Sequence, residues 1–440
     1  MKVTVVGLGK IGLPLSVRFA QSGHHVFGAD ISEATVDLVN DGMEPFPGEA
    51  HLEDNLREVL ASGRFEATTD TAAAIARSEV VVVVVPLIVD AESRPDFGAM
   101  DSATRDIGGA MRPGTLVSYE TTLPVGTTRD RFTPALAELS GLEPGVDFFV
   151  CHSPERVYSG RIFADLKAYP KLVGGIDEES AKRAVQFYES GLEFDDRDDL
   201  GRPNGVWDLG SAEAAELAKL AETTYRDINI AFANELARYA DRVGIDVNAV
   251  IDASNSQPFS HIHRPGIAVG GHCIPVYPRF YLAGDTEAEL PATARAVNLA
   301  MPGYAVQRLE DAIGRLDGLR VAVLGAAFRG GVKEAAFSGV FGVVEELTAR
   351  GAVPSVHDPL YEDDELVQLG LTAHALGSPC DAVIVQADHD EYRTLDPAEI
   401  PGARAVVDGR NVIDLSVFAT AGVPVLLLGS PGSPERPADA

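Results

Sequence analysis

Short, nearly continuous apolar runs alternate with longer amphipathic stretches over the first 200 residues. Strands of a parallel sheet have this pattern, because helices cover both faces of the sheet and bury every strand residue. The alternation therefore predicts a doubly wound domain over residues 1–200, with its first helix at Leu13–Ser22. The predicted strands are Val3–Val6, His25–Ala29, Val80–Val85, Leu116–Tyr119 and Phe148–Cys151.

The pattern changes after this domain. Residues 193–210 are acidic and rich in Gly and Pro, which predicts a loop. From Ser211 to Val243 the chain contains no Gly or Pro, and Ser211 can cap a helix that Gly244 would end. Such a helix would be roughly 50 Å long, which is unusual within one globular domain. It would bridge two domains or form a dimer interface; two helices broken near Asp227 are the alternative.

A second series of apolar runs begins beyond the helical region. Residues 245–300 have a Gly- and Pro-rich centre between helical flanks. We predict a central helical domain over residues 201–315, a second nucleotide-binding-type domain over 316–428 and a disordered tail over 429–440. The fold class is α/β, with two Rossmann-like doubly wound domains joined by a long central helix. The later predicted elements are the strands Arg320–Leu324, Val353–His357, Ala382–Val385 and Ala405–Val407 and a helix over about Phe337–Arg350.

Length and charge limit the function. A chain of 440 residues exceeds the usual size of one domain, about 100–200 residues. The net charge of −30 disfavours binding to nucleic acid or to an anionic membrane, so an anionic substrate would need local Arg or Lys side chains. The longest apolar run is far shorter than the roughly 20 residues that cross a bilayer, and the N-terminus does not resemble a signal peptide. We therefore expect a cytoplasmic protein. The three cysteines suggest neither a disulfide framework nor a metal site.

A glycine-rich segment, Gly7-Leu8-Gly9-Lys10-Ile11-Gly12, follows the first strand and opens a helix. In a dinucleotide site, the first glycine permits a tight turn, the second lets the backbone approach the pyrophosphate, and the third lets helix and strand pack closely. The helix N-terminus then faces the phosphates. Asp30, at the end of the second strand, would bind the adenosine ribose and repel a 2′-phosphate, which favours NAD over NADP. A glycine-rich turn without a ligand is the alternative.

Three polar residues have both a chemical and a structural interpretation. Cys273 lies in a glycine-rich loop, where a ligand could approach a thiol that is nucleophilic as the thiolate. Lys219 lies on the long predicted helix, and Glu155 follows a strand end, where such folds bind ligands. A structural Cys, a solvated Lys and a loop Glu are the corresponding alternatives.

Seven segments, in this order and spacing, resemble the UDP-glucose/UDP-N-acetylhexosamine 6-dehydrogenase family over about residues 1–428. They are Val6-Gly7-Leu8-Gly9-Lys10-Ile11-Gly12-Leu13-Pro14, Thr121-Thr122-Leu123-Pro124-Val125-Gly126-Thr127-Thr128, Ser153-Pro154-Glu155-Arg156-Val157, Pro170-Lys171-Leu172-Val173-Gly174-Gly175, Ala215-Glu216-Leu217-Ala218-Lys219-Leu220, Gly270-Gly271-His272-Cys273-Ile274-Pro275 and Asp408-Gly409-Arg410-Asn411.

This resemblance implies a four-electron oxidation of the sugar C6 hydroxymethyl group to a carboxylate, with two NAD per sugar. Cys273 would capture the intermediate aldehyde as a thiohemiacetal, a second hydride transfer would give a thioester, and water would hydrolyse it. Lys219 would stabilise the oxyanion and the thiolate, and Glu155 would activate the water. The resemblance also implies a homodimer through the helix of residues 211–243.

Further site residues match the family motifs. Thr223 and His272 would join Cys273, Lys219 and Glu155 in catalysis. The NAD site would comprise Gly7, Gly9, Lys10, Ile11, Gly12, Asp30, Pro86 and Thr122. The UDP-sugar would contact Arg156, Arg264, Gly271, Tyr277, Phe328, Arg329 and Lys333. Among these, Arg329 and Lys333 would supply cations that the surface lacks elsewhere, although Lys333 has simple solvent exposure as its alternative.

The chain departs from many UDP-glucose members at three positions. Leu87, Thr223 and Tyr277 stand where those members have Thr, Asn and Asp, so the proton relay near C6 must differ. Tyr277 is a poor base near neutral pH, and His272 is a candidate acceptor unless it only orients its loop. These positions and the segment His272–Val276 resemble the UDP-N-acetylmannosamine/UDP-N-acetylglucosamine branch. A UDP-N-acetylhexosamine is therefore the expected substrate. UDP-glucose oxidation is one alternative, and an impaired module that only binds NAD and a nucleotide sugar is another.

Overall fold

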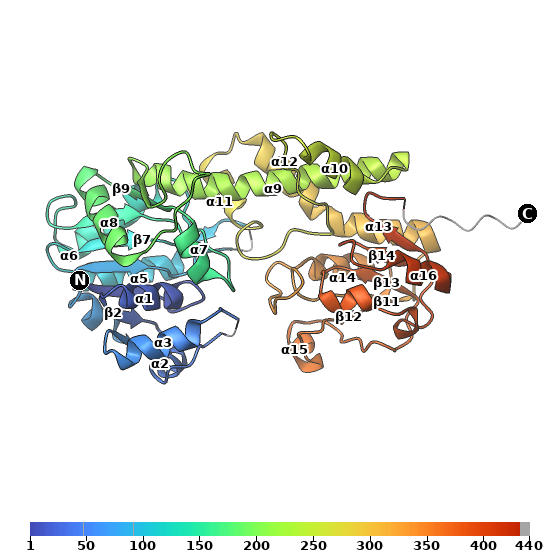
Figure 1. The fold of residues 1–440 in the computed structure, drawn as a ribbon, viewed down its shortest axis with the longest axis horizontal. Coiled ribbons are helices and arrows are strands. Elements are labelled where there is room, and N and C mark those ends of the chain that lie inside the picture. Colours follow the sequence, from blue (N-terminus) through green and yellow to red (C-terminus); the bar gives the residue numbers. More distant parts are fainter. Residues whose placement is uncertain (47, 91, 432–440) are drawn as a thin grey trace, which may run out of the picture. The chain divides into compact units, whose positions relative to one another are not determined.

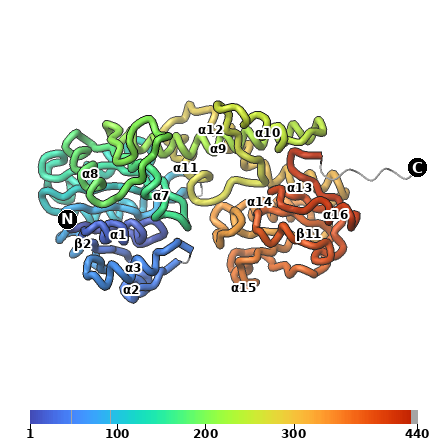
Figure 2. The backbone as a smooth tube through the Cα atoms, viewed as in Figure 1, coloured from blue at the N-terminus to red at the C-terminus, as the bar shows by residue number. Residues whose placement is uncertain are grey.

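The computed structural model describes residues 1–46, 48–90 and 92–431. The chain forms two compact units, each of which is described by itself below. The first unit contains Met1–Glu222 and Arg279–Gly284, and the second contains Thr223–Pro278 and the residues from Asp285 onward. In Figure 2 the tube is blue to green through most of the first unit, and the C-terminal part of the second is orange to red.

An eight-stranded sheet forms the centre of the first unit, in the order β10-β9-β8-β7-β4-β1-β2-β3. All neighbours are parallel except β8 and β9, which pair antiparallel with His152 opposite Gly174. The predicted loop of residues 193–210 is wrong at its end, because three of its residues form the edge strand β10. The strands are β1 (Lys2–Val6), β2 (His25–Ala29), β3 (Phe65–Thr68), β4 (Val80–Val83), β7 (Leu116–Tyr119), β8 (Phe149–His152), β9 (Lys171–Gly175) and β10 (Val206–Asp208), with β5 (Ile88–Val89) and β6 (Pro95–Asp96) forming a separate hairpin.

Helices flank this sheet and bury its central strands. The four residues of β4 are all buried, as the continuous apolar run predicts. Phe19 and Phe187 lie with ring centroids 5.0 Å apart in the core between α1 and α8. The helical elements are α1 (Gly12–Gln21), α2 (Glu33–Asn40), α3 (Leu52–Ala61), α4 (Thr71–Ile75), α5 (Gly98–Ala110), the π-helix η1 (Thr128–Phe132), α6 (Thr133–Ser140), α7 (Ile162–Ala168) and α8 (Glu178–Gly191).

The long central helix is confirmed. Helix α9 (Ala212–Val243) is one unbroken ribbon in Figure 1. The Ala214 N–H donates to Ser211 Oγ at 3.2 Å, so Ser211 caps the helix as predicted, and Gly244 follows it with a φ of +71°. The alternative of a break near Asp227 is wrong, because Asp227 lies inside the helix and its carboxylate pairs with the guanidinium of Arg295.

A five-stranded parallel sheet forms the core of the second unit, in the order β12-β11-β13-β14-β15. Its strands are β11 (Arg320–Leu324), β12 (Val353–His357), β13 (Ala382–Val385), β14 (Val406–Asp408) and β15 (Val425–Leu427). The later helical elements are α10 (Val247–Asn255), α11 (Tyr277–Gly284), α12 (Glu289–Leu299), α13 (Met301–Ile313), α14 (Gly339–Ala349), α15 (Asp363–Gln368), the 3-10 helices η2 (Asp390–Thr394) and η3 (Pro397–Glu399), and α16 (Leu415–Ala421).

The predicted fold class is confirmed: two α/β units with largely parallel sheets are connected through α9. The tail differs from the prediction at its start, because the Gly429 N–H donates to Asp241 Oδ1 and the Gly429 carbonyl accepts from the Val247 N–H. The rest of the predicted disordered tail, residues 432–440, lies outside the described residues. Among the helices of the described residues, none is long and apolar enough to cross a membrane.

Candidate active site

The glycine-rich segment forms a tight turn between β1 and α1. Gly7 has a φ of +96°, which favours glycine, and its N–H donates to the Ala29 carbonyl at 2.8 Å. A Cβ on Gly12 would lie 1.8 Å from the Gly7 carbonyl oxygen, so helix and strand approach too closely for any side chain. A Cβ on Gly9 would meet no protein atom within 4 Å. Protein packing therefore requires glycine at position 12, whereas position 9 is open to a ligand.

The groups around this turn fit a dinucleotide. Asp30 follows β2, and its carboxylate accepts the Leu8 N–H at 2.8 Å and the Ser32 N–H at 2.9 Å. Each carboxylate oxygen keeps a lone pair that a ribose hydroxyl can use. The first turn of α1 carries no side-chain cap and no acidic residue, so the positive end of the helix dipole is available to a pyrophosphate. Lys10 is exposed and Ile11 half-buried beside this turn.

Two neighbouring strand ends carry the other predicted NAD residues. Pro86 is exposed just after β4, and Leu87 behind it is buried, as an apolar residue in this position should be. Thr122 is buried after β7, and the hydroxyl of Thr121 donates to the Val85 carbonyl at 2.6 Å. Both segments therefore lie at the carboxyl ends of parallel strands, where doubly wound sheets bind their ligands.

The first unit also holds Lys219 and Glu155. Lys219 is buried on α9, so the alternative of a solvated lysine is wrong. Its charge lies close enough to Glu155 to favour the ionised carboxylate. Arg156 Nε donates to Glu222 at 2.9 Å, and its N–H donates to Glu155 Oε1 at 2.6 Å. Thr223 is buried one helical turn beyond Lys219.

Sequence reasoning missed two residues that contact this group. Lys171 Nζ donates to Glu155 at 2.8 Å and to Glu120 at 2.7 Å, and all three side chains are largely buried. Burial opposes the ionisation of both carboxyl groups. For Glu155, burial raises the pKa, but the Lys171 charge and hydrogen bond, the Arg156 N–H and the Lys219 charge together outweigh burial and lower it. For Glu120, burial prevails and the pKa is raised. Both carboxyl groups follow the carboxyl ends of strands, and this signal could have identified Glu120.

Cys273 lies in the second unit, where its loop is held against a second loop. Gly271 has a φ of +85°, and its N–H donates to the Ala336 carbonyl at 2.9 Å. A Cβ on Gly270 would lie 2.5 Å from the Cβ of Phe328. The backbone of Gly270 therefore packs directly against the Phe328 side chain. Cys273 itself is exposed, and its carbonyl accepts the N–H of Tyr277 at 2.9 Å as α11 begins.

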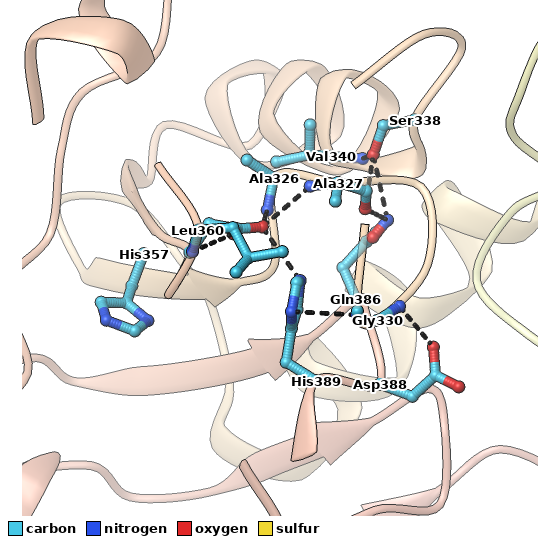
Figure 3. A network of polar contacts seen from close by, with 12 residues as sticks. Ala326, Ala327, Gly330, Ser338, Val340, His357, Leu360, Gln386, Asp388 and His389 are labelled. Atoms are coloured by element: carbon cyan, nitrogen blue, oxygen red, sulfur yellow. Dashed lines mark hydrogen bonds and ion pairs between the residues drawn. The ribbon is translucent and has the colours of Figure 1, made fainter. Parts of the chain in front are cut away.

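A buried polar network holds the turn of Ala326 and Ala327, which directly precede Phe328 in the chain (Figure 3). The Asp358 carboxylate accepts the N–H groups of Ala326 at 2.8 Å and Ala327 at 2.9 Å, and His389 Nε2 lies 3.1 Å from it. Because the Gly331 N–H donates to His389 Nδ1 at 3.4 Å, the ring proton must lie on Nε2 and face Asp358. Asp358 follows β12 as Asp30 follows β2, so both units use an acid at the second strand to hold the first turn.

Polar residues around these loops occupy defined positions. His272 contacts the Glu334 carboxylate, in agreement with a role in orienting the loop. Arg329 is exposed, with its guanidinium 5.8 Å from the centroid of the Phe328 ring. Lys333 forms an exposed ion pair with Glu365 at 2.6 Å. Arg264 contacts Asp252 and lines a cavity of 260 Å³. The cavity is also lined by Asn248, Pro265, Asp408, Gly409, Arg410, Asn411, Leu427 and Leu428.

Comparison with known proteins assigns the three parts of the chain. Residues 1–191 match the NAD binding domain of the UDP-glucose/GDP-mannose dehydrogenase family, 213–300 its central domain and 322–415 its UDP binding domain. The chain belongs to this family. It is thus an NAD-dependent nucleotide-sugar dehydrogenase by family, which confirms the resemblance seen in the sequence and the prediction of NAD.

Individual relatives of the UDP-glucose/GDP-mannose dehydrogenase family resemble the chain over nearly its full length. A UDP-N-acetyl-D-mannosamine dehydrogenase from Pyrococcus horikoshii is 34% identical over 94% of this chain and 96% of its own. A solved structure of UDP-D-ManNAc dehydrogenase from the same organism has a TM-score of 0.87, at 31% identity over 98% and 100% of the two chains. The structure of a UDP-glucose dehydrogenase from Pyrobaculum islandicum has a TM-score of 0.81, at 29% identity over 93% and 94%.

Proposed function

We propose that this protein oxidises the C6 hydroxyl of a UDP-N-acetylhexosamine, UDP-ManNAc or UDP-GlcNAc, to the uronate in two NAD-dependent steps. The likeness to UDP-N-acetyl-D-mannosamine dehydrogenases supports this class of sugar. The exposed thiol of Cys273, on a glycine turn held against Phe328, is the observation that carries the covalent mechanism. An exposed thiol fits a nucleophile better than a structural residue, which would be buried.

The chemistry proceeds through a carbon–sulfur bond. NAD, held at the glycine turn of Gly7–Gly12 and by Asp30, would supply the hydride acceptor for both oxidations at C6. After the first, the Cys273 thiolate adds to the C6 aldehyde, and the resulting thiohemiacetal keeps the carbon in place for the second oxidation. Water then adds to the thioester, the carbon–sulfur bond breaks and the thiolate leaves. One sugar alcohol and one water thus give one uronate, two NADH and three protons.

Lys219 would stabilise charge during the reaction, and Glu155 would act in hydrolysis. Lys219, a buried cation, would stabilise the negative charge that develops on the C6 oxygen. Glu155, an ionised carboxylate with one oxygen on Lys171 and the other on a backbone N–H, would take a proton from the hydrolytic water. Thr223 and His272 would replace the proton relay that the UDP-glucose members build from other residues, with Tyr277 as a hydrogen-bonding contact of the sugar.

We expect contacts with the substrate from residues of each unit, taken separately. Arg156 would contact it from the first unit. From the second, Gly271 and Phe328 would contact the substrate, and Arg264, Arg329 and Lys333 would face its anionic diphosphate. These cations matter because the net charge of −30 repels a nucleotide sugar in general.

The deciding experiment counts NADH per sugar, with UDP-ManNAc, UDP-GlcNAc and UDP-glucose offered separately. Two NADH per N-acetylhexosamine and a uronate product are expected. Two NADH from UDP-glucose alone would favour the second candidate, which the structural likeness to a UDP-glucose dehydrogenase supports. One NADH would show that oxidation stops at the aldehyde. No NADH from any of the three would favour an impaired NAD- and nucleotide-sugar-binding module.

A homodimer through α9 is the assembly we propose. Three aromatic side chains, Tyr225, Phe232 and Tyr239, are 57%, 49% and 56% exposed. They are spaced by seven residues, which returns to the same face of a helix after two turns. A row of exposed aromatic side chains on one helix is typical of an interface between subunits, and a second copy of α9 is the partner we infer.

A further inference from the structure

Antiparallel pairing of one strand brings a lysine to the carboxyl edge of the first sheet. Glu120 follows β7 and Glu155 follows β8, so both lie where parallel strands end. Strand β9 runs the other way and pairs Gly174 with His152. Continuing this register by three residues places Lys171, the first residue of β9, opposite Glu155. The reversal of β9 is therefore what puts an ammonium group between the two carboxyl groups.

The lysine is held on several sides. Its Nζ lies 2.7 Å from Glu120 Oε2, 2.8 Å from Glu155 Oε2 and 4.9 Å from the centroid of the Tyr188 ring. The Tyr188 hydroxyl donates to Glu120 Oε1 at 2.7 Å and meets Ser118 Oγ at 2.7 Å. The side chains of Lys171 and Glu120 are 4% and 0% exposed, whereas that of Glu155 is 11% exposed. Of the two carboxyl groups, Glu155 is the one that solvent can reach.

Stability alone does not account for this arrangement. A buried ion pair contributes little net stability, because desolvation of the charges offsets their attraction, and apolar residues of similar size often replace such pairs at no cost. Lys171 also donates to two carboxylates rather than one. A structural pair would be complete with Glu120, so the contact with Glu155 calls for another reason.

We propose that Lys171 is a positioning residue that keeps Glu155 ionised and fixed for hydrolysis of the Cys273 thioester. Glu120 holds the lysine in place through its own hydrogen bond to Nζ. This inference rests on the proposed function. In the hydrolytic step, the water oxygen bonds to the thioester carbon, the carbon–sulfur bond breaks, the sulfur leaves as the thiolate, and Glu155 receives a water proton. A protonated Glu155 cannot take that proton. The charge state of Glu155 therefore controls hydrolysis but does not affect either hydride transfer.

The charges that face Glu155 set the expected pH dependence. They are Lys171 on β9, Glu120 after β7, Lys219 on α9 and the neighbouring Arg156, which is paired with Glu222; the neutral Tyr188 hydroxyl lies on the far side of Glu120. The Lys171 charge and its hydrogen bond contribute most to lowering the pKa of Glu155 against burial. Without Lys171, the pKa of this buried carboxyl should rise. Without the Glu120 charge, it should fall further, because repulsion between the two carboxylates is lost.

Four variants test this proposal: Lys171→Met, Lys171→Arg, Glu120→Gln and Lys167→Met. Lys167 is 42% exposed and serves as the control for loss of a lysine charge in this unit. Pre-steady-state NADH formation and the mass of acid-quenched enzyme, measured across pH, separate oxidation from hydrolysis. In Lys171→Met we expect the burst of two NADH per Cys273 to persist and the acyl-enzyme to accumulate. Its hydrolysis at neutral pH should fall by about tenfold or more, with the acid limb moved to higher pH.

The other variants test the direction in which the acid limb of the pH profile moves. Lys171→Arg should restore hydrolysis, Lys167→Met should resemble the wild type, and Glu120→Gln should move the acid limb to lower pH. A merely structural pair would not move the limb in opposite directions for the two changes. Unchanged pH profiles in Lys171→Met and Glu120→Gln, with a wild type that yields two NADH per sugar, would overturn the proposal.

A measurement without substrate separates this inference from the proposed function. The carboxylate infrared band of Glu155, isolated as the difference between wild type and Glu155→Gln, reports its ionisation directly. Its titration should move to higher pH in Lys171→Met and to lower pH in Glu120→Gln, and titration at the wild-type pH in both would refute the proposal. If Lys171→Met fails to fold, Glu120→Gln alone decides it. If the wild type oxidises no sugar but the two variants show these shifts, only the proposed function is refuted.

Discussion

The Cα of Gly12 faces the carbonyl oxygen of Gly7 so closely that a Cβ would lie 1.8 Å from it. Only glycine can occupy that position, since a real Cβ contact below 3 Å requires the backbone to shift. Gly9, three residues earlier, has no protein atom within 4 Å of its Cβ direction. Packing of the helix against the strand therefore requires Gly12, whereas at Gly9 we propose that glycine is needed for the approach of NAD.

This difference predicts opposite effects for two alanine variants. Gly9→Ala should fold with nearly the melting temperature of the wild type but lose NAD affinity by at least about tenfold, since the methyl group occupies space near the pyrophosphate. Gly12→Ala should lower the melting temperature, because the turn must open. Thermal unfolding and NAD titration of both variants provide the check. Unchanged NAD binding in Gly9→Ala would contradict the placement of the pyrophosphate at this turn.

Cys273→Ser should abolish uronate formation and leave NAD binding unchanged. A serine hydroxyl is far less acidic than a thiol, so it provides no nucleophile comparable to the thiolate. Alkylation of the wild type offers a matched test, because Cys273 is the exposed cysteine, and burial raises the pKa of Cys151 to about 12 and that of Cys380 to about 11. Iodoacetamide should therefore label Cys273 alone and abolish uronate formation. Persistent uronate from Cys273→Ser would exclude the covalent mechanism.

Most of the fold could be predicted because local signals were strong. Continuous apolar runs identified strands such as β4, and the absence of Gly and Pro identified α9 together with its Ser211 cap. The edge strand β10 was missed because its residues are only half-buried or exposed and lie in an acidic, Pro-containing stretch. An edge strand needs little apolar character, so its sequence resembles a loop.

The site was predicted less completely, for a physical reason. Motifs predicted ligand-binding residues such as Asp30 and Cys273, because those residues follow strands or lie in glycine turns. Lys171 lies in one of the family motifs, but β9 was not among the predicted strands, and the role of Lys171 depends on the antiparallel direction of that strand. Strand direction is a tertiary property that a short apolar run does not reveal, so the pairing of Lys171 with Glu120 required the structure.

The proposed α9 dimer predicts a monomer in Phe232→Glu. Light scattering at micromolar concentration should give the mass of two chains for the wild type. The carboxylate would place a charge in the middle of the Tyr225–Tyr239 face, where burying it unpaired is costly. Val367→Glu, at a residue 62% exposed on α15, is the control and should remain a dimer. A monomeric wild type would refute this assembly.

The buried pair of Asp227 and Arg295 predicts a large loss of stability on Asp227→Asn. Asp227 Oδ2 accepts from Arg295 Nε at 2.5 Å, and the two side chains are 0% and 7% exposed. Removing one partner leaves a buried charge without compensation, which costs about 3–5 kcal/mol. Asp252→Asn breaks the exposed pair with Arg264 and should cost less than about 1 kcal/mol. Urea unfolding of both variants measures the difference, and similar losses would contradict this account of burial.

Glu216 should make folding stability fall as the pH rises from about 5 to 8. Burial raises the pKa of Glu216 from 4.5 to about 7, although its carboxylate accepts hydrogen bonds from the Thr128 hydroxyl and from the N–H groups of Thr128 and Gly126. Between these two values the folded state holds a proton that the unfolded state has released. The stability that this proton provides is complete below pH 4.5 and lost above pH 7, a change of about 3 kcal/mol.

Glu216→Gln removes the titration, so the free energy of unfolding of the wild type minus that of the variant should decrease from pH 5 to pH 8. Taking this difference cancels the constant cost of placing an amide against the Gly126 N–H. Glu213→Gln, one turn earlier on α9, is the control: its hydrogen bond with Arg129 lowers the pKa of Glu213, so its contribution changes only below pH 5. A Glu216 difference that instead increases with pH would mean that the three hydrogen bonds outweigh burial and that this carboxyl group is ionised throughout.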